Sequence, residues 1–172
     1  MKVLWAPWRM NYIRKGKSKG CVFCNKLSEG KDEQNLILYQ GKHGFVIMNK
    51  YPYNNGHLMV VPKRHCLDFE QLKDLEIVEL FTLLKASLQA LRTTLSPHGF
   101  NIGINIGKSG GAGEEHLHLH IVPRWTGDTN FMPVFNEAKV IPEYLGETYR
   151  RLRSAFKPIS KRHQGKRGGQ IR

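Results

Sequence analysis

The chain has 172 residues, of which 40% are hydrophobic and 10% aromatic, and this composition fits one folded domain of ordinary size and not a disordered chain. No apolar run approaches the roughly 20 residues that span a bilayer, and the first residues lack the apolar segment of a signal peptide. We therefore expect a cytoplasmic protein without membrane contact. Three cysteines are too few for a disulfide scaffold.

The net charge of +13 is concentrated at the two ends of the chain. Residues 1–20 carry six basic side chains and no acidic one, and residues 147–172 carry nine basic and one acidic, whereas the centre is nearly neutral. This distribution predicts a domain over 21–156, between an aromatic and basic arm at 1–20 and a basic, mobile tail at 157–172. Such ends attract polyanions without reading sequence, so we expect at most nonspecific contact with nucleic acid.

The first motif of the central domain is Cys21-Val22-Phe23-Cys24. Two thiolates at this spacing can converge on one tetrahedral metal ion, so one interpretation of the motif is half of a zinc site. Two small buried residues explain the spacing equally well. A redox pair is the weaker interpretation, because no thioredoxin-like βαβ pattern follows.

The next segments predict three strands. Residues 35–39 and 45–49 are rich in β-branched and aromatic side chains and are separated by glycines, which indicates a hairpin. A loop over 51–56 then leads to a third strand at 57–62.

The strongest helical pattern runs from Asp74 to Leu95, before Ser96-Pro97 ends it. Its apolar residues recur every three or four positions and predict one face packed on a sheet: Ile77, Leu80, Phe81, Leu84, Leu88, Leu91 and Leu95. A fourth strand follows at 100–106, a fifth at 116–123, and a short helix at 142–156 with Tyr144, Leu145, Tyr149, Leu152 and Phe156 inward. Strands in a meander around one long helix predict an α+β fold with an antiparallel sheet of about five strands.

The fifth strand contains three histidines, His116, His118 and His120, alternating with aliphatic residues. Alternation places the imidazoles on one face, about 7 Å apart, and the aliphatic residues on the other. Imidazoles titrate near neutral pH and pack poorly, so the row indicates function. Two interpretations remain open, a metal platform or a nucleophilic imidazole. A three-histidine metal hydrolase would also need acidic partners that the strand does not reveal.

A glycine-rich loop over 107–113 directly precedes these histidines. Its backbone can approach a ligand closely and direct N–H groups at phosphate oxygens. Such a loop alone is weak evidence, but next to three aligned histidines it is specific.

A glycine-rich loop followed by three alternating histidines resembles the histidine triad (HIT) superfamily of nucleotide hydrolases and transferases. The resemblance covers roughly residues 21–125 and implies the HIT fold. It also implies that His118 attacks the α-phosphorus to form a nucleotidyl-histidine, while His120 donates to a phosphate oxygen. His57 matches a histidine beside the triad, with direct catalysis and a hydrogen-bond network equally good explanations.

The same resemblance implies further contacts with the nucleotide. Asn49 corresponds to a ribose ligand and Asn105 to an amide beside the phosphate, and the loop would bind phosphate through Ser109, Gly111 and Gly113. The sequence departs from several HIT hydrolases at 112–115, where Ala, Gly, Glu and Glu stand in place of polar Gln or Ser, so leaving-group handling differs.

The opening Trp5-Ala6-Pro7-Trp8 and the continuation Pro123-Arg124-Trp125 resemble the dinucleoside-polyphosphate phosphorylase-like subgroup. There Trp125 and Phe131 would stack on a base or serve ordinary packing, and Arg124 would meet the far phosphates.

The zinc-bearing members of the family imply that His65 and His116 complete a closed structural zinc site with Cys21 and Cys24. Cys66 is left over and is expected to be a buried residue. The family also implies a homodimer that pairs through the sheet and helix.

The resulting hypothesis is an enzyme that cleaves dinucleoside polyphosphates, such as diadenosine tetraphosphate, at the α-phosphate, with water or phosphate as acceptor. One alternative is a nucleoside phosphoramidase or adenylyl-conjugate hydrolase with the same histidine. Another, of a different class, is a zinc-stabilised nucleic-acid-binding module.

Overall fold

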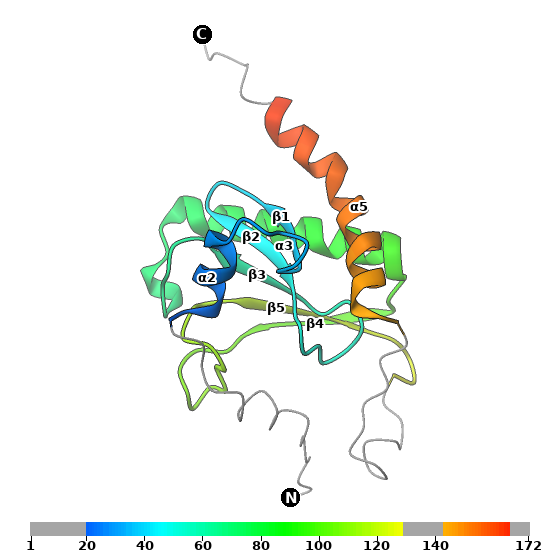
Figure 1. The fold of residues 1–172 in the computed structure, drawn as a ribbon. Coiled ribbons are helices and arrows are strands. Elements are labelled where there is room, and N and C mark those ends of the chain that lie inside the picture. Colours follow the sequence, from blue (N-terminus) through cyan, green and yellow to red (C-terminus); the bar gives the residue numbers. More distant parts are fainter. Residues whose placement is uncertain (1–19, 129–142, 166–172) are drawn as a thin grey trace, which may run out of the picture.

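The computed structural model describes residues 20–128 and 143–165, with side chains up to Lys157 (Figure 1). The predicted aromatic arm, except Gly20, lies outside the described residues, as do Phe131 and residues 166–172 of the predicted basic tail. Residues 157–165 of that tail continue a helix.

An antiparallel sheet of five strands forms the centre of the molecule, in the order β1-β2-β3-β5-β4 (Figure 1). Its strands are β1 (Ile37–Gln40), β2 (Gly44–Met48), β3 (Leu58–Pro62), β4 (Gly99–Ile104) and β5 (Leu119–Arg124). The α+β class and the strand number are as predicted, but the topology is not a simple meander. The last strand is inserted between β3 and β4, which makes β4 an edge strand.

One face of the sheet is covered by α3 (Asp74–Leu95), which follows a 3-10 turn, η1 (Phe69–Gln71) (Figure 1). The bounds of α3 are those predicted. At its start the Lys73 N–H donates to the Glu76 carboxylate at 2.8 Å, and at its end Ser96 adopts a left-handed conformation with φ 48°.

The predicted apolar stripe of α3 is partly wrong. Leu80 and Leu91 are buried and four of the other predicted residues are half-buried, but Phe81 is 52% exposed and Leu83 takes the inward position. The three-and-four spacing admits two neighbouring rows of leucines, and the sheet selects the row that includes Leu83.

The C-terminal helix α5 (Leu145–Gly165) is nine residues longer than predicted at its C-terminal end. Tyr149, Leu152 and Phe156 point into the core as predicted, whereas Tyr144 is exposed.

This helix also contacts the edge strand β1 (Figure 1). The Tyr149 hydroxyl donates to the Ile37 carbonyl at 2.9 Å, and the Arg153 guanidinium donates to the carbonyls of Ile37 and Leu38. These bonds satisfy backbone acceptors at one side of the sheet.

The opposite face of the sheet carries a second apolar cluster: Phe23, Ile37, Phe45, Ile47, Met59 and Val61. Phe23 comes from α2 (Val22–Ser28), a short helix not expected from the sequence. The candidate cysteines lie at the start of this helix, so α2 brings them to the histidine side of the sheet.

Among the described residues, no helix combines the length and apolarity needed to cross a bilayer.

Candidate active site

The three histidines approach the sheet in an extended segment, of which only His120 belongs to β5. The predicted strand at 116–123 therefore begins late. Pairing with β3 starts at Leu119, while the Leu117 N–H donates to the Cys66 carbonyl at 2.8 Å instead of to a strand. Alternation still holds, because Leu117 and Leu119 are buried in the core on the α3 side.

His118 is 5% exposed and has a defined tautomer. Its Nδ1 lies 2.7 Å from the His116 carbonyl oxygen, which only accepts, so Nδ1 carries the proton. The Nε2 lone pair is then available. Burial lowers the pKa of His118 below its ordinary value, which keeps the ring neutral at pH 7. A neutral imidazole with a directed lone pair is a nucleophile.

His120 lies beside it, with the two ring centroids 4.6 Å apart in an edge-to-face arrangement. The Tyr53 N–H donates to His57 Nδ1 at 3.1 Å, so the proton of a neutral His57 is on Nε2. That Nε2 lies 2.9 Å from His120 Nδ1, which therefore accepts. The proton of His120 is left on its Nε2, where it can be donated to a ligand.

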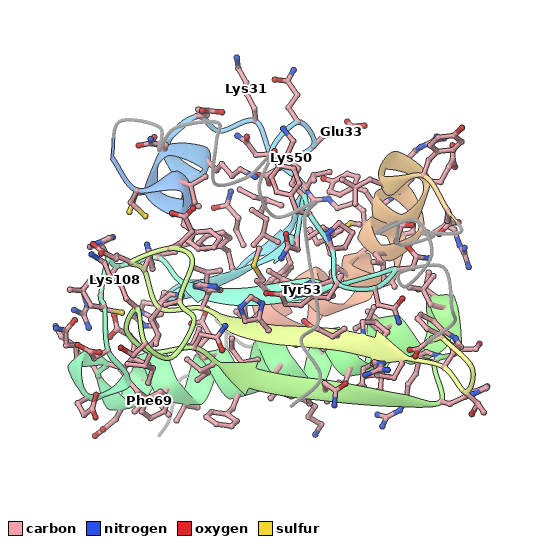
Figure 2. All side chains as sticks on the ribbon, turned by 90° about the horizontal axis from the view of Figure 1, so that it is seen from below. Lys31, Glu33, Lys50, Tyr53, Phe69 and Lys108 are labelled. Atoms are coloured by element: carbon pink, nitrogen blue, oxygen red, sulfur yellow. The ribbon has the colours of Figure 1, made fainter. Side chains whose placement is uncertain are left out.

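Tyr53 therefore belongs to the site, although sequence reasoning missed it (Figure 2). Its ring also stacks on His57, with centroids 4.9 Å apart. Asn54 was missed too. It is buried and donates to the Pro123 carbonyl at 3.0 Å and to Asp128 at 2.8 Å, which ties the loop before His57 to the end of β5. The turn sequence Asn54-Asn55-Gly56 was the available signal.

Four predicted metal ligands lie together: Cys21, Cys24, His65 and His116. Their donor atoms all lie within 4.8 Å of one another. Cys21 Sγ is 3.2 Å from His116 Nδ1, Cys24 Sγ is 3.6 Å from His65 Nδ1, and the two Nδ1 atoms are 3.3 Å apart.

These residues fit a zinc ion. Ligands at ordinary Zn–S and Zn–N distances stand roughly 3.3 to 3.8 Å apart in a tetrahedron, close to these three separations. His116 is prepared for this role, because its Nε2–H donates to the Pro62 carbonyl at 2.9 Å and leaves Nδ1 facing the cysteines. Burial lowers the pKa of His116 to about 4, so the ring is neutral. Cys66 is buried and outside this cluster, as expected.

The glycine-rich loop is a compact turn. The N–H groups of Gly110 and Ala112 donate to the Gly107 carbonyl, and the Gly111 N–H donates to the Lys108 carbonyl at 3.0 Å. The Asn105 amide donates to the Gly111 carbonyl at 3.4 Å. Gly111 has φ 84°, so a side chain there would be strained. The amide of Gly111 is thus engaged within the loop, and phosphate binding by Ser109, Gly111 and Gly113 stays a prediction.

Asn49 supports the loop after β2. The side-chain oxygen of Asn49 accepts from the Tyr51 N–H at 2.9 Å. The backbone N–H of Asn49 donates to the His57 carbonyl at 2.9 Å. The side chain is half-buried. A ribose contact remains a prediction.

Trp125 follows β5 at the end away from the triad, roughly 20 Å from His118 at the rise of a strand. Arg124 is held by Asp128 at 2.7 and 2.8 Å and by Asn101 at 2.8 Å. Contact of Trp125 with a base and contact of Arg124 with far phosphates stay predictions.

The similarity to known proteins covers most of the described residues. The family model described as the HIT domain matches residues 31–127, more than half of the chain. The chain belongs to the HIT family. A HIT relative from Mycobacterium tuberculosis, named AP-4-A phosphorylase, is 41% identical over 158 residues, which are 87% of this chain and 81% of that protein.

Two further matches are less similar in sequence. The Schizosaccharomyces pombe protein named bis(5'-nucleosyl)-tetraphosphatase [asymmetrical] is 28% identical over 129 residues, 75% of this chain and 68% of its own. A Zn-bound histidine triad family protein from Mycobacterium smegmatis superposes with a TM-score of 0.67 at 28% identity, covering 85% of this chain and 99% of that one. Together these matches show a HIT fold, and the named relatives support enzymatic activity on nucleotides.

Proposed function

We propose that this HIT protein cleaves dinucleoside polyphosphates at the α-phosphorus by nucleotidyl transfer through His118. The observation that carries the proposal is the fixed tautomer of His118. Its Nδ1–H is held by the His116 carbonyl at 2.7 Å, so Nε2 has a lone pair directed away from that bond.

The first step forms a bond between His118 Nε2 and phosphorus and breaks the bond between phosphorus and the bridging oxygen. The His120 Nε2–H donates to an oxygen of the reacting phosphate, which offsets the charge that develops there. The His57–His120 hydrogen bond leaves this proton on His120 Nε2. In the second step an acceptor attacks phosphorus and releases the His118 nitrogen.

The acceptor in the second step is either water or phosphate. The names of the relatives support both, since one is a phosphorylase and the other a tetraphosphatase. Product analysis with diadenosine tetraphosphate distinguishes them. Water as acceptor yields AMP and ATP, whereas phosphate as acceptor yields ADP and ATP. Omission of phosphate is the control. If neither pair forms while a nucleoside phosphoramidate is cleaved, the phosphoramidase alternative replaces this proposal.

We also propose that the cluster of Cys21, Cys24, His65 and His116 binds a structural zinc ion. Four protein donors would fill a tetrahedral site and leave no open position, so the ion would tie α2 to the segment before β5 and take no part in the reaction. The donor geometry and the zinc-bound Mycobacterium smegmatis neighbour support this assignment.

A homodimer through β4 and α3 is proposed on the exposed surface of these elements. β4 is a terminal strand of the sheet, with Ile102 46% exposed, and α3 exposes Val78 and Phe81 to 64% and 52%. Exposed apolar side chains and an open strand edge both favour pairing with another chain.

A further inference from the structure

Phe23 connects the candidate metal cluster with the nucleophile. It lies between Cys21 and Cys24 in the sequence, and its ring is 5.6 Å from the His116 ring and 5.1 Å from the His118 ring, centroid to centroid. It is 4% exposed and belongs to the apolar cluster on the histidine side of the sheet.

The His118 ring is restrained by three neighbours. The hydrogen bond to the His116 carbonyl fixes the position of Nδ1, but the ring can still tilt about that bond. His120 packs edge-to-face on His118, and Phe23 packs on it with the ring planes at 48°. These two rings limit the tilt and so fix the direction of the Nε2 lone pair. A displacement of about 1 Å at a reacting atom lowers a rate by roughly 100-fold.

Phe23 is also the single buried side chain of α2, a helix described over its whole length. Cys21 precedes the helix and Cys24 lies in its first turn, so the metal cluster and Phe23 hold the same short element. A shift of α2 after loss of the metal would therefore move the Phe23 ring on His118.

A second connection between the cluster and the nucleophile runs through His116. Its Nδ1 faces the cysteines and its carbonyl accepts from His118. Phe23 supplies neither the donor nor the acceptor of that hydrogen bond, so its replacement tests the packing contact while both partners of the bond remain in the chain.

We propose that Phe23 is a positioning residue for His118, and that the metal cluster orients the nucleophile through it. The inference rests on the proposed function, since it assigns a role in the same reaction. It predicts an effect on the chemical step and on the His118 ring itself, not on nucleotide binding.

The test compares Phe23→Leu with Leu27→Ala in the zinc-loaded protein. Leu27 lies on the same helix and packs on the same apolar cluster, so it serves as the matched control. Phe23→Leu should lower kcat on diadenosine tetraphosphate by about 10- to 100-fold with KM within about twofold. Imidazole nitrogen signals of His118 in 1H–15N spectra should shift in Phe23→Leu and stay in place in Leu27→Ala.

A second experiment removes the metal by chelation. Chelation should shift the His118 signals of the wild-type protein and add no further shift in Phe23→Leu, because the connection is already cut. A further shift of equal size in Phe23→Leu would assign the connection to His116 and overturn the proposal. Equal losses of kcat in both variants, or unchanged His118 signals in Phe23→Leu, would overturn it as well. If the wild type does not cleave the substrate, the proposed function fails, and the spectra still decide the role of Phe23.

Discussion

His57 Nε2 lies 2.9 Å from His120 Nδ1, and the Tyr53 N–H on the other side of His57 decides which ring donates. A backbone amide thus sets the protonation pattern of two side chains in succession. His57 is fully buried, so water does not compete for this hydrogen bond.

Replacement of His57 should show whether this residue acts through its hydrogen bonds or through packing alone. His57→Phe removes the donor to His120, and we expect kcat to fall by about 100-fold, the size of a lost acid–base contribution. His57→Gln offers both an acceptor to Tyr53 and a donor to His120, so it should recover part of the rate. Steady-state kinetics check both variants. Equal rates for the two would show that the hydrogen bond is not the relevant feature.

His118→Ala should abolish turnover while nucleotide affinity is largely kept, because the lone pair that attacks phosphorus is removed and the loop remains. Rapid quench of the wild type should trap an acid-labile nucleotidyl adduct on His118, and His118→Gly should regain a trace of activity with added imidazole. An adduct on His120 would contradict the assignment.

The metal assignment predicts about one zinc per chain by elemental analysis. Chelation should lower the thermal unfolding midpoint, because the ion joins α2 to the segment that carries His116. Cys24→Ser should lose the metal, whereas Cys66→Ser should retain it, since Cys66 lies outside the cluster. Metal-free protein of unchanged stability would rule the site out.

The lowered pKa of Glu76 predicts that the free energy of unfolding depends on pH. A hydrogen bond from Arg64 and one from the Lys73 N–H lower the pKa of Glu76 to about 2 from an ordinary 4.5. A depressed folded-state pKa stabilises the fold above pH 4.5, and this contribution is lost as the pH falls toward 2.

Glu76→Gln should therefore lower the free energy of unfolding by about 1 to 2 kcal/mol at pH 7, a range reduced for the partly exposed Arg64 side chain. The difference from wild type should shrink toward pH 2.5, as measured by denaturant unfolding. The exposed Glu70 provides the control, and Glu70→Gln should change little. A difference that is constant with pH would argue against the linkage.

The proposed dimer predicts that Phe81→Glu yields a monomer by light scattering, because a charge is placed in the apolar contact. Phe81 is half-exposed within one chain, so the fold should tolerate the change. Tyr144→Glu alters a more exposed side chain outside β4 and α3 and should leave the mass unchanged. A monomeric wild-type protein at micromolar concentration would contradict the proposal.

Periodicity alone predicted the strong elements well. The helix from Asp74 to Leu95 was recovered with its bounds, because its pattern is long and Ser96-Pro97 ends it. The outward position of Phe81 was not, since a row of apolar residues does not reveal which side faces the sheet. Helix α2 was missed because seven residues carry too little periodicity.

The residues of the candidate site were also predicted only in part. The four metal candidates were named from motif and resemblance, and they do converge in space. Tyr53 acts through its backbone N–H, which every residue except proline has, so its residue type carried no signal. Phe23 was expected only as the spacer of a cysteine motif, because a contact with a histidine 95 positions later depends on the tertiary fold.

The hydrogen bonds from Tyr149 and Arg153 to the β1 backbone limit how copies of this protein can assemble. If both sheet edges were open, β4 of one chain could join β1 of the next, and that head-to-tail contact would propagate into a filament. With α5 against β1, the described residues leave β4 as the edge for pairing, and two β4 strands can meet only about a twofold axis. In the proposed dimer, growth would then stop after one step, so α5 would block edge-to-edge polymerisation by covering β1.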